Sequence, residues 1–422
     1  MSSKAKTTAT QEEATPALVP KLRFPEFRGA WEKKTLETLG YFTGGGTPSK
    51  DNAAYWTGEI PWISSSDLTE DSISQINISR FITKQAVQDS ATKLVPAKSI
   101  LLVSRVGVGK LAISTFPLCT SQDFTNFTPT AANPLFLAYL LKSVKETLLS
   151  FNQGTSIKGF TKDNIASLRL GFPSPAEQQK IAECLSSVDD LIAAQAGKVD
   201  ALKTHKKGLM QQLFPTEGET QPRLRFPEFQ NAGEWKPRKA GTLFANRATK
   251  GEQGLPIYSV TMHDGMVKRD SFDRNFYDIE DAAGNKKVCK EDIAYNMMRM
   301  WQGALGVAPE DCLVSPAYIV LAPMNDAVPV FFQYLFKLPA TLLLLTSHSR
   351  GLTKDRLRLY YDDFARIPLR CPALPEQQRI ASCLSSLDAL ITAEIQKLEA
   401  LKTHKKGLMQ QLFPSPEETA DL

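Results

Sequence analysis

One short stretch of this 422-residue chain contains the residue types of a phosphate-binding loop. Ser104–Lys110 reads SRVGVGK, and glycines followed by a lysine let a loop and an ammonium group hold phosphates. The pattern GxxxxGK[ST] requires glycine at Ser104 and serine or threonine at Leu111, so the sequence fails it twice. Gly44–Pro48 (GGGTP) lacks the GxGxxG spacing of a dinucleotide-binding loop and predicts a flexible loop. Neither stretch predicts a nucleotide site.

The histidines and cysteines do not form a metal or nucleophile site either. The four histidines lack ligand or nucleophile partners at the required spacing. None of the six cysteines forms a CxxC pair, which is typical of a reducing compartment. The N-terminus has no apolar signal segment, and no apolar run is long enough to span a bilayer. We therefore predict a cytoplasmic protein that binds no metal, cofactor or membrane, and an enzyme with its own active site is the weaker alternative.

Basic and short polar side chains remain, and their chemistry would be contact with a polyanion. The net charge of +5 permits such a partner without demanding it. Lysine and arginine in loops suit phosphate contacts, whereas short polar side chains can hydrogen-bond to base edges. The candidates in the first half of the chain are Lys50, Ser64, Ser65, Ser66, Arg105, Lys110, Gln122, Lys158 and Lys162. The candidates in the second half are Thr261, His263, Lys268, Arg269, Arg299, Arg350 and Lys354.

The elements that must position these residues occur twice in the sequence. LKTHKKGLMQQLFP runs over Leu202–Pro215 and again, without a change, over Leu401–Pro414. Glu177–Ala194 returns with few changes as Glu376–Ala393. LRFPEF precedes each half, at 22–27 and at 224–229. A period this long is not that of a solenoid; it indicates two copies of one module, each a globular part followed by a long helix.

A heptad pattern predicts the long helix in each copy. Apolar residues recur at alternating steps of four and three, without proline, across Ala176–Phe214 and its repeat. The predicted seam of the first helix is Ile181, Leu185, Val188, Ile192, Val199, Leu202, Leu209 and Leu213, and that of the second is Ile380, Leu384, Leu387, Ile391, Leu398, Leu401, Leu408 and Leu412. Polar residues interrupt both seams at the same two places. Each helix forms a rod of roughly 58 Å that needs a partner, and the other copy is the obvious one.

Connectivity decides how the two helices pair. A whole globular segment separates them, so each helix begins beside its own globular part if the modules are alike. Pseudo-twofold symmetry then makes the pair an antiparallel coiled coil, with the globular parts at opposite ends. LRFPEF follows the first helix and also opens the first module. The chain should therefore behave like a circle cut once, with both termini near the end of the second helix.

The two globular parts match sparsely but in the same order, which predicts one mixed α/β domain used twice and an α+β class overall. Ser99–Ser104 and Ala317–Leu321 read as strands, and Pro134 and Pro329 open equivalent helices. GFTKD at Gly159 is aligned with GLTKD at Gly351. The predicted segments are a disordered tail (1–20), a first globular domain (21–173), a helical region (174–215), a linker (216–222), a second globular domain (223–372), a second helical region (373–414) and a tail (415–422).

Arg105 and Arg299 stand at equivalent positions of the two diverged parts. Retention in both copies sets them apart from the other candidates, because any one surface lysine or arginine is more often simply solvated. Phosphate contact and bracing of the fold both explain the two arginines, and both interpretations stay open.

The paired repeats EQQxIAxxLSSxD and GLMQQLFP, with LRFPEF before each half, resemble the specificity subunit of Type I restriction–modification enzymes over residues 21–414. The phrases IPWISSSDL, SRVGVGK and GxTKD are typical of the target-recognition domains of that family. The resemblance implies that each globular part reads one half of a bipartite, asymmetric DNA site. It also implies that the antiparallel coiled coil sets the spacing between the half-sites.

The same resemblance implies partners and places all catalysis in them. They would be double-stranded DNA, two modification (methyltransferase) subunits and restriction/translocase subunits. S-adenosylmethionine, ATP and Mg would be used by those subunits and none would be bound by this chain. On the residues alone, a two-headed adaptor that grips other proteins on a coiled-coil ruler stays open. A fused methyltransferase would need a cofactor motif that the sequence lacks.

Overall fold

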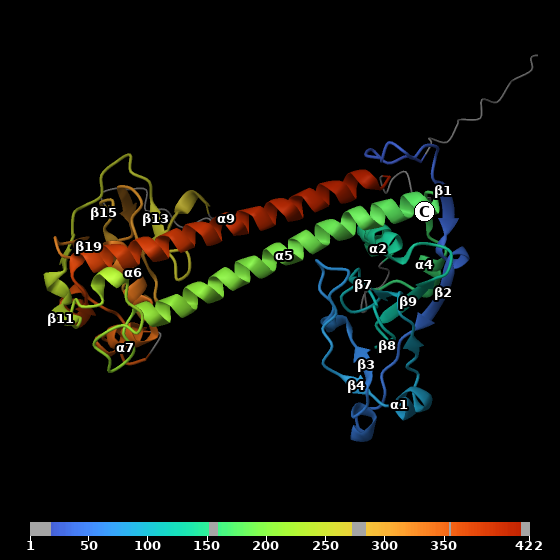
Figure 1. The fold of residues 1–422 in the computed structure, drawn as a ribbon, viewed down its shortest axis with the longest axis horizontal. Helices are drawn as coiled ribbons and strands as arrows, with labels where there is room; N and C mark the ends of the chain where they lie inside the picture. The colour runs from blue at the N-terminus through green and yellow to red at the C-terminus, as the bar shows by residue number, and fades with distance from the viewer. Residues whose placement is uncertain (1–17, 152–158, 272–283, 354–355, 415–422) are drawn as a thin grey trace, which may run out of the picture. The chain divides into compact units, whose positions relative to one another are not determined.

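A computed structural model describes residues 18–151, 159–271, 284–353 and 356–414. The chain divides into two compact units: the first contains Met1–Ala196 and Gln396–Leu422, and the second contains Gly197–Ile395. Each division falls inside a long helix, so the units do not follow the segment boundaries predicted from sequence. Each unit contains one globular domain, the first half of one long helix and the second half of the other (Figure 1).

The predicted tails lie largely outside the described residues, which exclude 1–17 and 415–422. Leu18 is already part of the first unit, because it is buried in the core and its carbonyl accepts a hydrogen bond from Trp31 N (2.8 Å). The ordered first domain therefore starts before the predicted boundary at residue 21.

The two long helices are α5 (Pro175–Leu213) and α9 (Leu374–Leu412), of 39 residues each. Proline in the first turn fits both starts, since its missing N–H would have no helical partner there. Every residue of the two predicted seams is buried or half-buried. The heptad prediction is confirmed within each unit.

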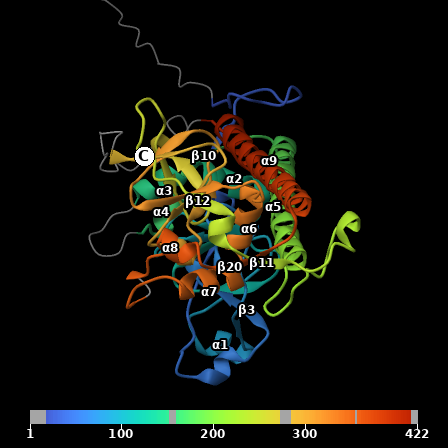
Figure 2. The ribbon, with the colours of Figure 1, turned by 90° about the vertical axis from the view of Figure 1, so that its left-hand side faces the viewer.

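Figure 2 shows α5 (green) and α9 (red) side by side, and the contacts within each unit show that the helix halves run antiparallel. In the second unit, Lys198 Nζ lies 2.6 Å from Glu394 Oε1, and the later Lys206 pairs with the earlier Asp388. In the first unit, Lys405 pairs with Asp189, and the later Leu412 packs with the earlier Ile181. The predicted antiparallel pairing is confirmed at this level.

Among the described residues, ten strands build the sheets of the first unit. β2 (Gly40–Gly44), β9 (Phe124–Pro129), β6 (Ile100–Val103) and β7 (Leu111–Ile113) form an antiparallel sheet in that order. β4 (Phe81–Ile82), β3 (Ile60–Ile63), β8 (Leu118–Thr120) and β5 (Leu94–Val95) form a second sheet, in which β3 and β8 are parallel. β1 (Glu32–Thr35) pairs with β10 (Arg169–Phe172). The shorter helices are α1 (Lys84–Asp89), α2 (Pro134–Ser143), α3 (Lys145–Ser150), α4 (Lys162–Ala166), and the 3-10 turns η1 (Leu36–Thr38), η2 (Ala53–Trp56) and η3 (Ser65–Asp67).

The second unit repeats this order of strands. β12 (Phe244–Asn246), β19 (Tyr318–Pro323), β16 (Ile293–Asn296) and β17 (Leu305–Val307) form the antiparallel sheet. β13 (Tyr258–Val260) pairs with β14 (Met266–Lys268), β15 (Lys286–Val288) with β18 (Cys312–Val314), and β11 (Lys236–Lys239) with β20 (Pro368–Cys371). The helices are α6 (Pro329–Phe336), α7 (Pro339–Ser347), α8 (Tyr361–Phe364) and the 3-10 turns η4 (Pro227–Phe229), η5 (Ala240–Thr242), η6 (Arg269–Ser271) and η8 (Met300–Gln302).

The strands of the two units correspond one to one, β1–β10 to β11–β20, with the same neighbours. Even the parallel contact recurs, because Trp62 pairs with Cys119 in the first unit and Ile257 bridges Leu313 in the second. The prediction of one mixed α/β domain used twice is confirmed. The two predicted strands appear as β6 and β19, and the two proline-initiated helices appear as α2 and α6.

One predicted correspondence is wrong. Phe160 N donates to Ser104 O, and the same bond in the second unit runs from Leu359 N to Met297 O, so Phe160 matches Leu359 rather than Leu352. The GLTKD phrase instead begins in the segment between Arg350 and Arg358. These two arginines exchange backbone hydrogen bonds with each other. The shared letters are a local likeness in a region where the second copy has a longer loop.

The domains differ most in the connections between matched strands. The segment from Ser64 to Arg80 joins β3 to β4 and contains η3, whereas a tight turn around Thr261–Gly265 joins β13 to β14. The strand framework is therefore shared and the loops are not.

The end of each long helix lies in the core of a globular domain. Phe413 packs with Trp31 and Phe136 in the first unit (ring centroids 6.4 and 5.6 Å away). Phe214 packs with Trp235 and Phe331 in the second (6.0 and 5.4 Å). The N-terminal segment is bound to the same end of α9, because Leu22 N donates to Gln411 O (2.9 Å). This contact confirms the predicted circular closure of the chain within the first unit.

No single helix among the described residues is long and apolar enough to cross a membrane. Together, α6 and α7 pass the test of length and composition, although the pair bends by 84°. Phe331, Phe332 and Phe336 of α6 lie fully buried in the domain core, so packing within the domain accounts for the apolar composition of that helix.

Candidate nucleic-acid interface

A buried glutamate ties the first turn of each long helix to the LRFPEF segment. Glu177 accepts from Arg23 Nε and Nη2, both at 2.8 Å, and from Trp31 Nε1 at 3.3 Å. Glu376 is equivalent: it accepts from Arg225 Nε and Nη2 (2.8 and 2.7 Å) and from Trp235 Nε1 (3.4 Å). Two-pronged arginine–carboxylate pairs are strong and directional. The glutamate of the EQQ repeat is therefore a structural residue that joins the long helix to the LRFPEF segment.

The next residue of the repeat positions a second helix. Gln178 Oε1 accepts from Asn133 N (3.0 Å) at the start of α2, and its Nε2 donates to Pro173 O (3.0 Å). Gln377 makes the matching bonds to Val328 N and Pro372 O (3.0 and 2.9 Å). Both glutamines are buried and use their amides on the backbone, so this letter is also structural.

A tyrosine, an aspartate and a lysine join α2, α5 and α9 in the first unit. Tyr139 donates to Asp189 Oδ2 (2.7 Å), Lys405 pairs with Asp189 Oδ1, and the Lys405 ammonium lies 5.4 Å from the centre of the Tyr139 ring. In the second unit the corresponding set is Tyr334, Asp388 and Lys206. We call these sets the first and second junctions. Each lysine is one of the two polar residues that interrupt its predicted seam.

Burial controls the ionisation of groups at the junctions. Burial, together with the hydrogen bond to Asp189, raises the pKa of Tyr139. Burial, together with the hydrogen bond to Asp388, raises the pKa of Tyr334. Burial lowers the pKa of Lys142 to about 8, and it also lowers the pKa of the equivalent Lys337. A tyrosine with a raised pKa keeps its hydroxyl proton and donates a hydrogen bond to the carboxylate. It is therefore a structural donor rather than an acid–base catalyst.

The loops that carry the first set of sequence candidates meet at one edge of the domain. β3 and β8 are parallel, so their carboxyl ends share an edge, and Ser121 N donates to Ile63 O (2.8 Å) there. Gly46 N donates to Thr120 O and Ser104 N to Asp123 O, both at 2.8 Å, which brings in two further loops. We call 45–50, 64–67, 104–110, 121–123 and 160–162 the first loop edge.

The Gly44–Pro48 loop is packed rather than flexible, so that prediction is wrong. A Cβ at Gly45 would stand 1.9 Å from Ser121 O, and one at Gly46 would stand 2.4 Å from Thr92 N. The chain approaches the strand ends so closely that only glycine fits. Trp62 Nε1 adds a hydrogen bond to Gly46 O (2.9 Å).

Most described candidates of the first domain lie on the first loop edge. Lys50, Arg105, Gln122 and Lys162 are exposed, and no acidic side chain among the described residues pairs with these three cations. Lys162 lies 6.0 Å from the centre of the Phe42 ring. Lys158 lies outside the described residues.

Other candidates on this edge hold the loops together. Lys110 donates to Leu68 O (3.2 Å), and Thr47 donates to Gln122 Oε1. Ser65 is half-buried within η3, and the Ser64 and Ser66 hydroxyls lie 2.9 Å apart. A role in the loop does not remove these side chains from the surface.

Sequence reasoning missed Arg80 at this edge. Arg80 Nη2 donates to Ser64 Oγ (2.8 Å) and pairs with Asp67, and the guanidinium carbon lies 4.7 Å from the centre of the Trp62 ring. The only sequence signal is an arginine one residue before a short β4, which is too weak to find it.

The second domain has a matching edge made of 261–265, 297–303 and 315–317, which we call the second loop edge. The segments 261–265 and 315–317 follow β13 and β18, whose ends meet at the parallel bridge of Ile257 and Leu313. Thr261 Oγ1 accepts from Asp264 N (2.9 Å) and shapes the turn, and His263 is exposed on it. The third segment follows β16, as 104–110 follows β6.

The equivalent arginines Arg105 and Arg299 occupy the same kind of turn. Each is exposed and follows the matched strand β6 or β16. The glycine four residues later is left-handed in both, with φ of 89° at Gly109 and 82° at Gly303. The side chains make no ion pair among the described residues. Bracing of the fold by these side chains therefore finds no support, and phosphate contact remains a prediction.

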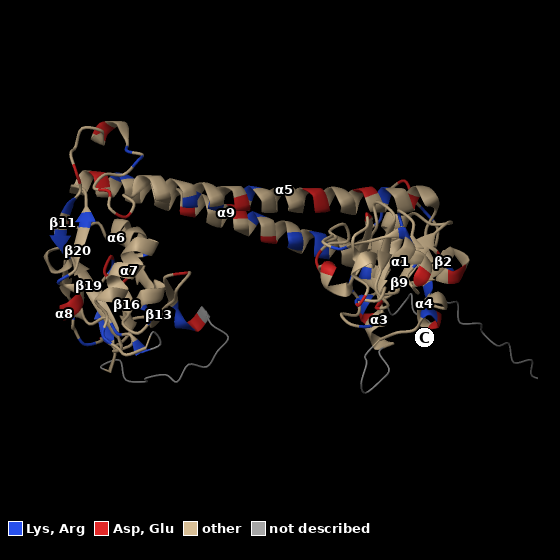
Figure 3. Cartoon of the chain, turned by 90° about the horizontal axis from the view of Figure 1, so that it is seen from below, with Lys and Arg blue, Asp and Glu red and all other residues tan. Residues whose placement is uncertain are grey.

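The remaining candidates of the second domain are tied to other side chains. Lys268 pairs with Glu310 (2.8 Å), and Arg350 pairs with Asp363 (2.7 Å). Arg269 Nε donates to Ser259 Oγ (3.2 Å). Lys354 lies outside the described residues. Figure 3 shows lysine and arginine interspersed with acidic residues along both helices rather than in one continuous stripe.

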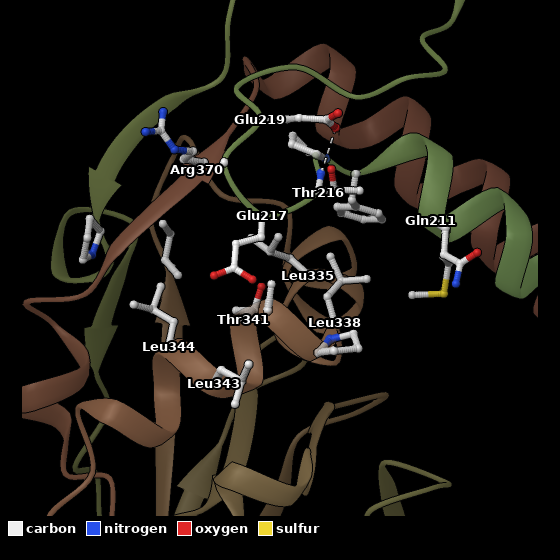
Figure 4. Close-up of a pocket in the computed structure, with 18 of the residues that line it drawn as sticks. Gln211, Thr216, Glu217, Glu219, Leu335, Leu338, Thr341, Leu343, Leu344 and Arg370 are labelled. Carbon is white, nitrogen blue, oxygen red and sulfur yellow. Dashed lines mark hydrogen bonds between the residues drawn. The ribbon is translucent and has the colours of Figure 1, made fainter.

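A cavity of about 650 Å³ lies in the second unit, between the end of α5, α7 and β20 (Figure 4). Leu335, Leu338 and Leu344 line it, and none of the sequence candidates does. Polar groups at its rim are partly paired with each other, because Thr216 N donates to Glu219 Oε2 (3.3 Å).

The described residues contain no group of three or more histidine, cysteine or acidic side chains that could hold a metal ion. Burial raises the pKa of Cys119 and Cys371 to about 11 and that of Cys312 to about 12. A thiol with a raised pKa is a poor nucleophile.

The family model described as the Type I restriction modification DNA specificity domain matches the chain twice, at residues 29–204 and 235–403. The chain belongs to this family. Each match covers one globular domain and most of the long helix that follows it.

Relatives in this family include two specificity subunits. The MjaIX specificity subunit of Methanocaldococcus jannaschii is 36% identical over 168 residues, which is 38% of each chain. The EcoR124I/EcoR124II specificity subunit of Escherichia coli is 32% identical over 184 residues, 40% of this chain and 43% of that one. The match thus spans less than half the length of each of these relatives.

The fold also matches solved structures. The S subunit of the Type I restriction–modification system from M. genitalium aligns with a TM-score of 0.60 at 16% identity, over 94% of this chain and 100% of that one. A chain from a structural study of type I R-M complex assembly aligns with a TM-score of 0.54, over 91% and 97%. At this identity the likeness concerns the fold.

Proposed function

We propose that this chain is the DNA-specificity subunit of a Type I restriction–modification complex and reads a bipartite, asymmetric site. Each loop edge would read one half-site. The observation that carries this proposal is that two domains with matched strands present unlike loops at the same edge: Ser64–Arg80 in the first domain and Thr261–Gly265 in the second. A shared framework with different loops fits recognition of two different DNA sequences.

Catalysis would lie in partners rather than in this chain. Two modification subunits would methylate adenine with S-adenosylmethionine, and restriction subunits would translocate and cleave DNA with ATP and Mg. The exposed faces of the identical stretches 202–215 and 401–414 would offer the same surface twice, to two copies of one partner. Their buried faces already have a role in the fold.

The antiparallel helices would set the spacer between the half-sites. Adding four residues near Gln195 lengthens α5 by about 6 Å. Because one turn of B-DNA is about 34 Å, the spacer should grow by one or two base pairs. Sequencing of methylated sites in a host that carries the variant and its modification subunit measures the spacer, and an unchanged spacer contradicts this role.

A domain exchange tests the bipartite reading itself. Replacing residues 223–372 with the second domain of a related subunit should change one half of the methylated sequence and leave the other half unchanged. A change in both halves contradicts the assignment of one half-site to each domain. A non-DNA adaptor would yield no methylated motif, and any DNA affinity it showed would lack the steep salt dependence of phosphate contacts.

A further inference from the structure

Arg80 is held in one orientation at the first loop edge. Its guanidinium stacks on the Trp62 ring at 4.7 Å, while Nη2 donates to Ser64 Oγ at 2.8 Å and pairs with Asp67. Asp67 also accepts from Ser64 N (2.7 Å), so the carboxylate is fixed by the turn that it caps. A stacked, ion-paired guanidinium loses little further freedom when it binds a ligand.

An arginine–serine pair stands at the same place in the second domain. Arg80 faces Trp62 across the strand pair, since Trp62 N donates to Arg80 O (2.9 Å). Arg269 faces the matched residue Ile257, since Arg269 N donates to Ile257 O (2.9 Å). Ser64 stands two residues after Trp62, and Ser259 stands two residues after Ile257. Each serine hydroxyl accepts a hydrogen bond from the arginine of its own domain. The pair recurs although the loops around it differ.

Free donors remain on Arg80. The Arg80 side chain is 37% exposed, and that of Asp67 is 13% exposed. Within the part of the chain that the structure describes, Nε and Nη1 of Arg80 make no hydrogen bond. The neighbouring carboxylate cancels most of the charge, so the group contributes little general attraction to phosphates. What it offers is direction, which suits a base edge better than a phosphate.

We propose that Arg80 and Arg269 are base-reading residues, one for each half-site, and that each donates to a guanine in the major groove. Guanine is the base whose major-groove edge presents two acceptors, N7 and O6. Asp67 is then a positioning residue that holds the Arg80 guanidinium toward the groove. This inference rests on the proposed DNA-reading function and names the residues that carry it out.

The test compares Arg80→Gln, Asp67→Asn and Arg269→Gln in the full chain, together with its modification subunit. Methylated-site sequencing should show that Arg80→Gln relaxes one position of one half-site, with about a five- to 150-fold loss of discrimination. Arg269→Gln should relax one position of the other half-site only. DNA in which 7-deazaguanine replaces guanine at the relaxed position should reproduce part of the loss with the unchanged protein.

Asp67→Asn separates base reading from bracing of the loop. Loss of the carboxylate releases the arginine's charge, so total DNA affinity should rise and depend more steeply on salt while discrimination falls. Arg80→Gln should lower total affinity. If both variants lower affinity and melting temperature alike, the cluster only braces the loop and the proposal is overturned.

Two other results have separate meanings. Unchanged methylation motifs in Arg80→Gln and Arg269→Gln, with methylation intact, overturn this proposal and leave the proposed function in place. Absence of any methylated motif with the unchanged chain, its modification subunit present, overturns the proposed function itself.

Discussion

Each domain has a base, where the first turn of the long helix binds the LRFPEF segment, and a loop edge. The two copies of the sequence are similar at the base and different at the loop edge. At the base, Glu177 and Glu376 bind an arginine and a tryptophan with nearly the same distances in the two units. At the loop edge, the two domains share only a few residues, among them Arg105 and Arg299. Sequence identity between the two copies therefore tracks structural contacts at the base, and divergence tracks the surface that we propose reads DNA.

The largest test of this comparison is removal of the buried glutamates. Glu177→Ala leaves Arg23 and the Trp31 N–H without their partner, and Glu376→Ala does the same to Arg225 and Trp235. Loss of one member of a buried ion pair costs about 3–5 kcal/mol of unfolding free energy. Denaturant unfolding measures the loss, and hydrogen exchange should locate it in the unit that carries the change.

Glu183→Ala provides the control, because Glu183 is exposed on α5 and, among the described residues, its carboxylate accepts a single hydrogen bond, from the Gln179 side chain. It should change stability by less than about 0.5 kcal/mol. Markedly different losses for Glu177→Ala and Glu376→Ala would break the claim that the two bases are equivalent.

The junctions give a smaller and unequal effect. Side-chain exposure is 11% for Lys405 and 24% for Asp189, against 21% for Lys206 and 43% for Asp388. Lys405→Met should cost about 1–3 kcal/mol, since a partly buried carboxylate loses its partner. Lys206→Met should cost less, because water reaches the second aspartate. Equal losses in chemical denaturation would show that exposure does not explain the difference.

The sequence predicted the framework well because the framework is periodic. The seam from Ile181 to Leu213 follows the helical repeat, and connectivity then required antiparallel pairing. The EQQ contacts were missed, although a signal existed: LRFPEF and EQQ recur together, and LRFPEF supplies the arginine while EQQ supplies the glutamate. A repeated motif that contains opposite charges indicates a contact.

The loop edge was harder to predict because its geometry depends on strand register. Arg80 reaches Ser64 only through the pairing of β3 with β4 across the intervening loop. The GLTKD phrase misled for the same reason, since Gly351 lies in a loop longer than its apparent counterpart. A short sequence match does not show where the chain rejoins the sheet.

Arg105 and Arg299 test whether the loop edges meet phosphates. Arg105→Ala and Arg299→Ala should each weaken DNA binding uniformly across sequences and reduce the slope of log affinity against log salt by about 1. Fluorescence anisotropy over a salt series measures both. Arg169→Ala, at the exposed first residue of β10, which pairs with β1, should leave the slope unchanged. A changed motif without a changed slope would instead make these arginines base readers.

The smallest effect concerns the pH dependence of the first junction. Lys405, Asp189, Asp71 and Lys145 surround Lys142, whose pKa burial lowers from 10.5 to about 8. Between these two values the unfolded chain binds more protons than the folded chain, so the Lys142 contribution to stability rises with pH.

Lys142→Met should therefore stabilise the protein at pH 7 and abolish that rise. Because the amine is half-buried and donates to Glu70 O (2.9 Å), we expect a difference of about 1 kcal/mol. Unfolding of both proteins from pH 7 to 10 measures it. Lys337→Met should show the same sign in the second unit. A stability difference that does not vary with pH would mean that Lys142 keeps its proton throughout. If Lys337→Met then did show a pH-dependent difference, the two junctions would be alike in geometry but not in charge.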